Sequence, residues 1–243
     1  MEVGLNHFDV ERFISSNQLP LIETDNLYAI VKAVERVALR PHCLAIVAPQ
    51  GYGVSRSLTY LEEKLRPDAL RFEVKRNQKF KSFVQEMLFQ SGHESPGYLY
   101  HNCALPDLMH ACKYLFESSY SKKLIMMDNV NYWKEQSIGS FTQFMENNTS
   151  KTGAVFAITP RFLKKAESKA LHDSDWQKFM DLIDEWLILE KPANEDMNAI
   201  CFESGIIHEG TINEIVSSCS NLRQLNTMLG RLRRHVKEKV NAN

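Results

Sequence analysis

The sequence lacks an excess of charge of one sign, a long apolar run and the patterns that target a chain to a membrane. It has 29 lysine and arginine residues against 30 aspartate and glutamate residues, so its formal net charge is -1. That balance excludes a protein that coats nucleic acid with its whole surface. No stretch approaches the roughly 18 apolar residues that a membrane helix needs, and the N-terminus does not have the pattern of a signal peptide.

Cysteine, glycine and proline are also scarce. The five cysteines are an odd number without CxxC spacing, so we expect reduced thiols in a cytoplasmic protein. Ten glycines and eight prolines among 243 residues exclude a collagen-like or linker-dominated chain. With 44% hydrophobic residues, the composition fits one large globular domain or one domain with a small satellite.

Short apolar runs alternate with helical patterns along most of the chain. Three of the runs are almost continuously apolar, which is typical of strands buried on both faces of a parallel sheet. The predicted strands cover residues 43–48, 70–74, 124–128, 154–158 and 186–189. The predicted helices between and before them cover residues 27–39, 55–65, 80–90, 105–118, 138–147 and 173–184. This alternation predicts an α/β fold with right-handed crossovers.

The pattern changes after Pro192, because no further strand follows. Three helical stretches cover residues 195–203, 211–218 and 222–239, and Asn194 or Asn221 is a candidate N-cap. We therefore expect an α/β core over residues 1–190 and a helical subdomain over residues 191–243.

The first predicted strand leads into the segment APQGYGVS at residues 48–55, and a helix follows. This is the context of a phosphate-binding loop, G-x-x-x-x-G-K-[ST], whose glycines let backbone N–H groups surround phosphate oxygens. Gly53 and Ser55 fit the pattern, but Val54 replaces the lysine that neutralises the outer phosphates. An ordinary glycine-containing turn is the alternative. The candidate nucleotide contacts in this segment are Pro49, Gly51, Tyr52, Gly53, Val54, Ser55 and Arg56.

A second candidate position follows the third predicted strand. Asp128 ends that strand, where a phosphate-loop ATPase holds its magnesium. The next residue in such enzymes is often a glutamate that polarises the attacking water, but here it is Asn129, which cannot accept a proton. The fourth strand ends at Thr159, a polar tip able to reach a γ-phosphate.

The order of these features resembles an AAA+ ATPase, and within that superfamily the MuB/TnsC/IstB-type regulators of DNA transposition, with degenerate Walker A and Walker B motifs. The resemblance extends over residues 23–235 and includes LIMMDN at 124–129, GAVFAITP at 153–160 and SNLRQL at 220–225. It implies a P-loop AAA+ three-layer fold with a mostly parallel five-stranded sheet and a small C-terminal helical lid.

The same resemblance implies roles for individual residues. Thr24 would border the adenine of ATP or ADP, and Ser55 and Asp128 would hold magnesium. Thr159 would be the first sensor of the γ-phosphate, and Arg223 the second sensor, with a solvated helix residue as its alternative. Asp128, Asn129, Thr159 and Arg223 are thus the candidate catalytic positions.

A basic run covers residues 64–81, which include seven basic residues and two acidic ones. In the resembling family this region faces double-stranded DNA inside a ring or filament of copies. Arg76, Lys79 and Lys81 occupy that place and are candidate phosphate contacts. A solvated charge run is the alternative.

The resemblance implies a DNA-binding, oligomeric regulator of transposition that recruits a transposase or related recombination protein, and Val54 and Asn129 predict that it does not hydrolyse ATP at an ordinary rate. Two alternatives stay open. One is a pseudo-ATPase scaffold that acts through protein contacts only, and the other is an active ATPase with a substituted cation, for which Arg56 is one candidate.

Overall fold

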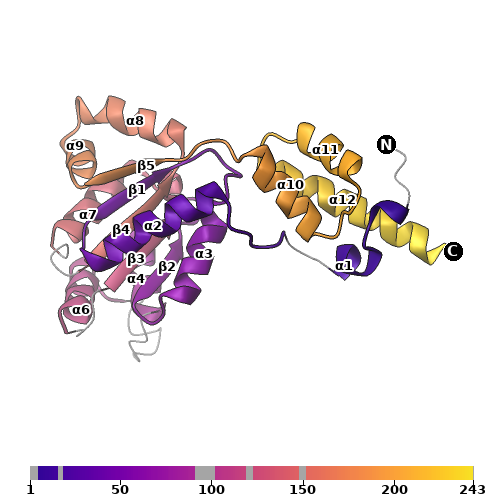
Figure 1. Cartoon of the computed structure of the whole chain (residues 1–243). Coiled ribbons are helices and arrows are strands. Elements are labelled where there is room, and N and C mark those ends of the chain that lie inside the picture. Colours follow the sequence, from indigo (N-terminus) through magenta and orange to yellow (C-terminus); the bar gives the residue numbers. More distant parts are fainter. Residues whose placement is uncertain (1–4, 16–18, 91–101, 119–122, 148–151, 243) are drawn as a thin grey trace. The chain divides into compact units, whose positions relative to one another are not determined.

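The computed structural model describes residues 5–15, 19–90, 102–118, 123–147 and 152–242 (Figure 1). The chain forms two compact units. The first, called the sheet unit below, consists of Ile30–Pro49 and Val54–Ile188. The second, called the helical unit, consists of Met1–Ala29, Gln50–Gly53 and Leu189–Asn243.

The sheet unit is built on five parallel strands in the order β2-β3-β4-β1-β5. The strands are β1 (Cys43–Val47), β2 (Ala69–Glu73), β3 (Lys123–Asp128), β4 (Thr152–Ile158) and β5 (Glu185–Ile188). Every residue of β1 and β4 is buried, which explains their continuous apolar sequence. The predicted α/β fold with a five-stranded sheet is confirmed, and the sheet is parallel throughout.

Helices cover both faces of this sheet. Helices α2 and α3 cross the face that is turned toward the viewer in Figure 1, and α3 contacts β2 and β3. Aromatic rings fill the opposite side, where Phe141 packs edge-on against Phe156 at 5.2 Å between ring centres. The helical segments that lie wholly or partly in this unit are α2 (Asp25–Leu39), α3 (Val54–Lys64), α4 (Phe80–Gln90), α6 (Leu105–Ser118), η2 (Val130–Tyr132), α7 (Glu135–Glu146), α8 (Pro160–Ala170) and α9 (Ser174–Asp181).

The helical unit has its own apolar core. Phe13, Ile215 and Leu229 are fully buried in it, and the Arg233 guanidinium lies over the Phe13 ring, 5.4 Å from its centre. Asn221 caps the last helix as expected, since its side chain accepts a hydrogen bond from the Gln224 N–H at 3.0 Å. The described helices are η1 (Leu5–His7), α1 (Val10–Ser15), α10 (Asn194–Glu203), α11 (Glu209–Ser217) and α12 (Leu222–Asn241).

The division differs from the expected boundary at the N-terminus. We expected residues 1–190 to form one core, but the segment up to Ala29 groups with the C-terminal helices. Phe8 and Phe13 are buried among apolar side chains of α10, α11 and α12, so burial of these two rings accounts for the difference. Within the described part of the chain, no helix has the length and apolar character to cross a membrane.

We predict that Phe13→Ala lowers the free energy of unfolding by about 3–5 kcal/mol, because it removes a fully buried ring from the core of the helical unit. Phe202→Ala is the matched control, since that ring is 53% exposed in the same unit. Urea denaturation measures both. Equal losses for the two variants would show that the N-terminal segment does not stabilise the helical unit.

Candidate functional site

The carboxylate of Asp128 lies at the centre of the candidate site in the sheet unit. It ends β3 and is only 4% exposed. Burial raises the pKa of Asp128, and this effect is opposed by a hydrogen bond from the Ser55 hydroxyl, by the charge of Arg71 and by the Asn129 N–H. A buried carboxylate that keeps a hydroxyl and a cation as partners is typical of a functional position.

Arg71 is the cation beside this carboxylate. In the register of β2 against β3, Arg71 lies opposite Met126 and Glu73 lies opposite Asp128. The Arg71 Nη1 atom is 3.9 Å from Asp128 Oδ2, and its Nε atom is 3.4 Å from Glu62 Oε2 of α3. Sequence reasoning counted Arg71 only as part of a basic run, because its neighbour on β3 depends on strand pairing.

Asn129 takes the backbone conformation of a sharp turn. Its φ is 60° and its ψ is 34°, in the left-handed region that asparagine tolerates better than most residues. Its side-chain amide donates to Glu73 Oε1 at 3.3 Å. The Glu73 carboxylate of β2 therefore lies beside Asn129, the position where a glutamate is expected. Sequence reasoning did not identify Glu73.

Thr159 follows β4 and caps α8. Its hydroxyl oxygen accepts a hydrogen bond from the Phe162 N–H at 3.3 Å. Capping uses the oxygen as an acceptor, and a hydroxyl can donate as well. The strands β3 and β4 are parallel, so Asp128 and Thr159 both lie at the carboxyl-terminal end of the sheet. The role of Thr159 as a sensor stays a prediction.

The candidate phosphate loop needs both of its glycines. Gly51 has a φ of 91° and Gly53 a φ of 92°, values that residues with a Cβ adopt only with strain. Helix α3 begins directly afterwards at Val54, so Ser55 lies in its first turn, where N–H groups and the helix dipole favour an anion. Burial lowers the pKa of Arg56, the next cation in this turn.

The tip of the loop, Gln50–Gly53, packs within the helical unit against the start of α12. Arg223 Nη1 donates to Gln50 Oε1 at 2.7 Å, and the Leu222 N–H donates to the Gly51 carbonyl at 2.9 Å. A Cβ at Gly51 would lie 2.7 Å from Asn221 Oδ1, so this approach also requires glycine. The expected second sensor therefore contacts the loop tip through Gln50.

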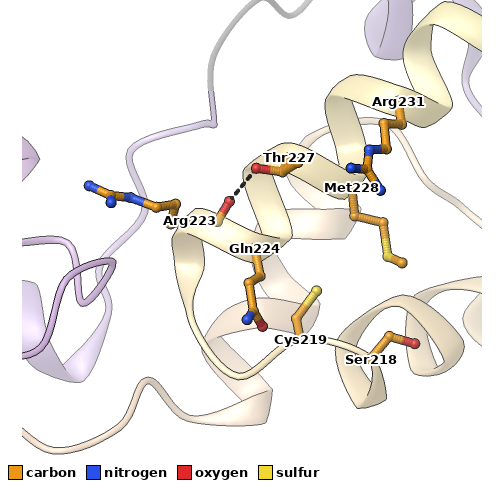
Figure 2. Close-up of a pocket in the computed structure, with 7 residues that line it drawn as sticks. All are labelled: Ser218, Cys219, Arg223, Gln224, Thr227, Met228 and Arg231. Carbon is orange, nitrogen blue, oxygen red and sulfur yellow. Dashed lines mark hydrogen bonds between the residues drawn. The ribbon is translucent and has the colours of Figure 1, made fainter.

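Arg223 is also at the border of a pocket of about 400 Å³ in the helical unit. Figure 2 shows its side chain pointing away from Met228 and Arg231, which belong to the same lining. The Arg223 side chain therefore points toward Gln50, to which it donates a hydrogen bond, and not into this pocket.

The remaining predicted residues occupy other places. Thr24 caps the start of α2, because its hydroxyl accepts a hydrogen bond from the Leu27 N–H at 3.1 Å. Its role near adenine stays a prediction.

In the basic run, Lys75 pairs with Glu86, and the Arg76 guanidinium lies 5.5 Å from the centre of the Tyr132 ring. Within the described ranges, no ion pair involves the predicted DNA contacts Arg76, Lys79 and Lys81.

The comparisons with known proteins agree with this geometry. Residues 38–165 match the model of a family described as an AAA domain. The match covers more than half of the chain, which therefore belongs to the AAA domain family. No curated protein matches the sequence.

Two solved structures show the same fold at low identity. Cdc6p from Pyrobaculum aerophilum matches with a TM-score of 0.62 and 12% identity over 93% of this chain and 63% of that one. The replication initiator DnaA, bound to AMPPCP and single-stranded DNA, matches with a TM-score of 0.56 and 13% identity over 100% of this chain and 70% of that one. The chain thus spans less than two thirds of the Cdc6p chain.

We predict that Asp128→Asn raises the stability of the protein at neutral pH. A folded-state pKa above the ordinary 3.8 means that the folded state favours the protonated carboxyl, so the charged form costs stability once the pH exceeds the folded pKa. The gain of the variant should therefore disappear as the pH falls below 3.8. Thermal melts across pH measure it, with Glu63→Gln on the exposed side of α3 as control. A destabilised Asp128→Asn at pH 7 would contradict the prediction.

Proposed function

We propose that the chain is an AAA+ regulator that binds ATP or ADP without rapid hydrolysis, assembles on DNA and serves DNA transposition. The observation that supports it most is the loss of two catalytic groups in a site that keeps its binding groups. Val54 stands at the lysine position and Asn129 at the glutamate position, while Ser55 still donates to Asp128.

The binding groups suit a nucleotide. The first turn of α3 has backbone N–H groups of the kind that bind phosphate oxygens. The Ser55 hydroxyl and the Asp128 carboxylate are oxygen donors of the kind that magnesium takes, and magnesium would neutralise phosphate charge when bound. Thr159 and Arg223 are the proposed sensors of the γ-phosphate, and Thr24 the proposed neighbour of the adenine.

The missing groups decide the rate of hydrolysis. A preorganised cation facing the β/γ phosphates is usually among the larger catalytic contributions, and Val54 cannot supply one. General-base assistance contributes about 10²–10⁴-fold, and Asn129 cannot supply it. The two losses need not add, because both groups serve one transition state.

The structure also favours one alternative, an active ATPase whose groups come from another strand. Glu73 accepts from Asn129 at 3.3 Å, and Arg71 lies 3.9 Å from Asp128. Both belong to β2 and both have paired neighbours on β3. If the protein does hydrolyse ATP, Glu73 is the carboxylate best placed to orient water.

We predict no steady ATP turnover near one per second, with or without duplex DNA, at protein concentrations that allow assembly, because Val54 and Asn129 remove the two groups above. Release of phosphate measures the rate. Turnover that is lost in Glu73→Gln but kept in Glu63→Gln, a change of an exposed carboxylate of α3, would instead establish the active ATPase.

The proposal that the chain binds DNA rests on the basic run and on the fold. One structure with this fold is described as DnaA bound to single-stranded DNA. Arg76 and Lys79 are exposed and Lys81 is half-buried, so the three can meet a phosphate backbone. The transposition role, the transposase as partner and the ring or filament rest on the motif order around residues 48–55 and 124–129.

We predict that replacing Arg76, Lys79 and Lys81 with glutamine weakens duplex binding equally for different sequences and lowers the salt slope, because phosphate contacts release counterions without reading bases. The control changes three other exposed cations on α8 and α9, Lys165, Lys169 and Lys178, of which the first two pair with Glu135. Fluorescence anisotropy at several salt concentrations measures both. An equal effect of the two triple variants would assign the binding to overall charge and not to this run.

A further inference from the structure

The last helix, α12, carries most of the positive charge of the helical unit. The unit has eight lysine and arginine residues and twelve aspartate and glutamate residues. Six of the eight cations lie on α12, whereas Glu238 is its single acidic residue. The helix is therefore strongly basic in a unit that is otherwise acidic, and such an asymmetry directs a polyanion to one element.

One arginine of α12 belongs to the core of the unit. Arg233 is 7% exposed, and its guanidinium donates to the Phe13 carbonyl at 3.1 Å. Leu225, Leu229 and Val236 are buried as well, and their spacing places them on the same side of the helix as Arg233. This side of α12 is thus held in the core, and the other side is free for other contacts.

The opposite side of α12 carries a polar stripe. Thr227, Gly230, Arg234 and Lys237 follow one another at spacings of three and four residues, so they lie in one line along the helix. Arg231 flanks this line, and the five residues are called the basic stripe below. Its three cations are exposed, and among the described residues none of them is in an ion pair. Their charges are therefore available to a partner of opposite charge.

Gly230 is a second observation at the same place. A glycine in the middle of a helix lowers the stability of that helix relative to alanine. A Cβ at Gly230 would meet no atom of the described residues within 4 Å, so packing inside the chain does not require a glycine here. A missing side chain does let a partner approach the helix backbone closely, and the approach would be between Thr227 and Arg234.

The chemistry of the stripe fits a phosphate backbone better than an acidic peptide or a lipid surface. Its three cations are spread over about 9 Å of helix, and duplex DNA carries about five phosphate charges along that length of its axis. Arg231 and Arg234 have planar guanidinium groups, each of which can pair with two phosphate oxygens. The stripe has no large apolar side chain, whereas a helix that lies on a lipid surface inserts such side chains.

We propose that the basic stripe of α12 binds the phosphate backbone of duplex DNA and is a second contact surface, in the other unit from the basic run at residues 64–81. The inference rests on the DNA binding proposed above, which it deepens. It requires neither bound nucleotide nor hydrolysis, and contacts of this kind add affinity without reading the base sequence.

The first test compares the salt dependence of duplex binding for the wild-type protein and for an Arg231→Gln, Arg234→Gln variant, measured by fluorescence anisotropy. Loss of two phosphate contacts should lower the slope of log K against log salt by about 1.8, equally for duplexes of different sequence. Both side chains are exposed, so the melting temperature of the protein should not fall.

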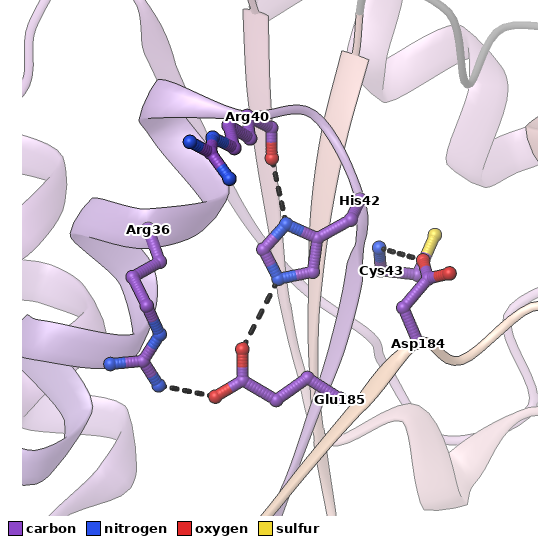
Figure 3. A network of polar contacts seen from close by, with 6 residues as sticks. All are labelled: Arg36, Arg40, His42, Cys43, Asp184 and Glu185. Atoms are coloured by element: carbon purple, nitrogen blue, oxygen red, sulfur yellow. Dashed lines mark hydrogen bonds and ion pairs between the residues drawn. The ribbon is translucent and has the colours of Figure 1, made fainter.

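The matched control is an Arg12→Gln, Arg36→Gln variant, which removes two arginines and changes the net charge equally. Arg12 pairs with Glu203 in the helical unit. Figure 3 shows Arg36 of α2 paired with Glu185 of β5 in the sheet unit. Because carboxylates already engage both guanidinium groups, their loss should leave the salt slope unchanged.

Gly230→Gln tests the close approach without removing a charge. Glutamine is a better helix former than glycine, and the space around this position is open, so the melting temperature should rise. The long side chain should nevertheless weaken duplex binding, because it keeps the helix backbone away from the phosphates. Gly230→Ala is the control, since it gives the same gain in helix propensity with a much smaller obstruction.

The outcomes separate this inference from the DNA-binding proposal. A salt slope that the stripe variant changes no more than the control variant does would overturn the inference, as would unchanged binding by Gly230→Gln. Binding that is lost in the variant of Arg76, Lys79 and Lys81 but kept in the stripe variant would overturn the inference and leave the DNA-binding proposal intact.

Other occupants of the stripe would be recognised in the same experiments. Polyglutamate that binds as tightly as duplex DNA, and that the stripe variant no longer binds, would assign the stripe to an acidic protein and overturn the inference. Self-association that the stripe variant loses in sedimentation without DNA would assign it to a second copy of the chain, with the same consequence. Absence of wild-type binding to duplex DNA at low salt would overturn the DNA-binding proposal itself.

Discussion

The buried negative charge of Asp128 is the constraint on which the rest of the site depends. Removing a carboxylate from water is costly unless hydrogen bonds and an opposite charge compensate for it. The Ser55 hydroxyl, Arg71 and the Asn129 N–H compensate for part of that cost, while burial still raises the pKa of Asp128. Because these groups come from α3, from the turn after β3 and from β2, the same contacts that favour the charged form of Asp128 also link the helix to the sheet.

Strand β2 carries two charged residues that contact Asp128 and Asn129. Arg71 and Glu73 are two residues apart and therefore point to the same face of the sheet, where their paired neighbours on β3 are Met126 and Asp128. Arg71 is a cation near Asp128, the proposed magnesium ligand, and Glu73 accepts a hydrogen bond from the Asn129 side chain. Strand β2 thus adds one cation and one carboxylate beside the candidate site.

Much of the fold could be predicted from the sequence, because strands buried on both faces require continuous apolar runs. Strand β5 was predicted one residue late, at 186–189, since its first residue is Glu185, which pairs with Arg36 and His42 at the surface. The positions of Ser55 and Asp128 followed from motif spacing, and their contact agrees with it. Arg71, Glu62 and Glu73 could not be found in this way, because their roles depend on the register of two strands more than fifty residues apart in the chain.

The most direct test of the central claim, nucleotide binding that supports assembly without turnover, is electron microscopy of the purified protein with duplex DNA, with and without ATP. The account predicts ordered rings or filaments on DNA only when ATP is present, and it predicts that they persist for hours because the nucleotide is not consumed. Assemblies that disperse as ATP is converted to ADP would contradict the claim, as would assemblies that are the same without nucleotide.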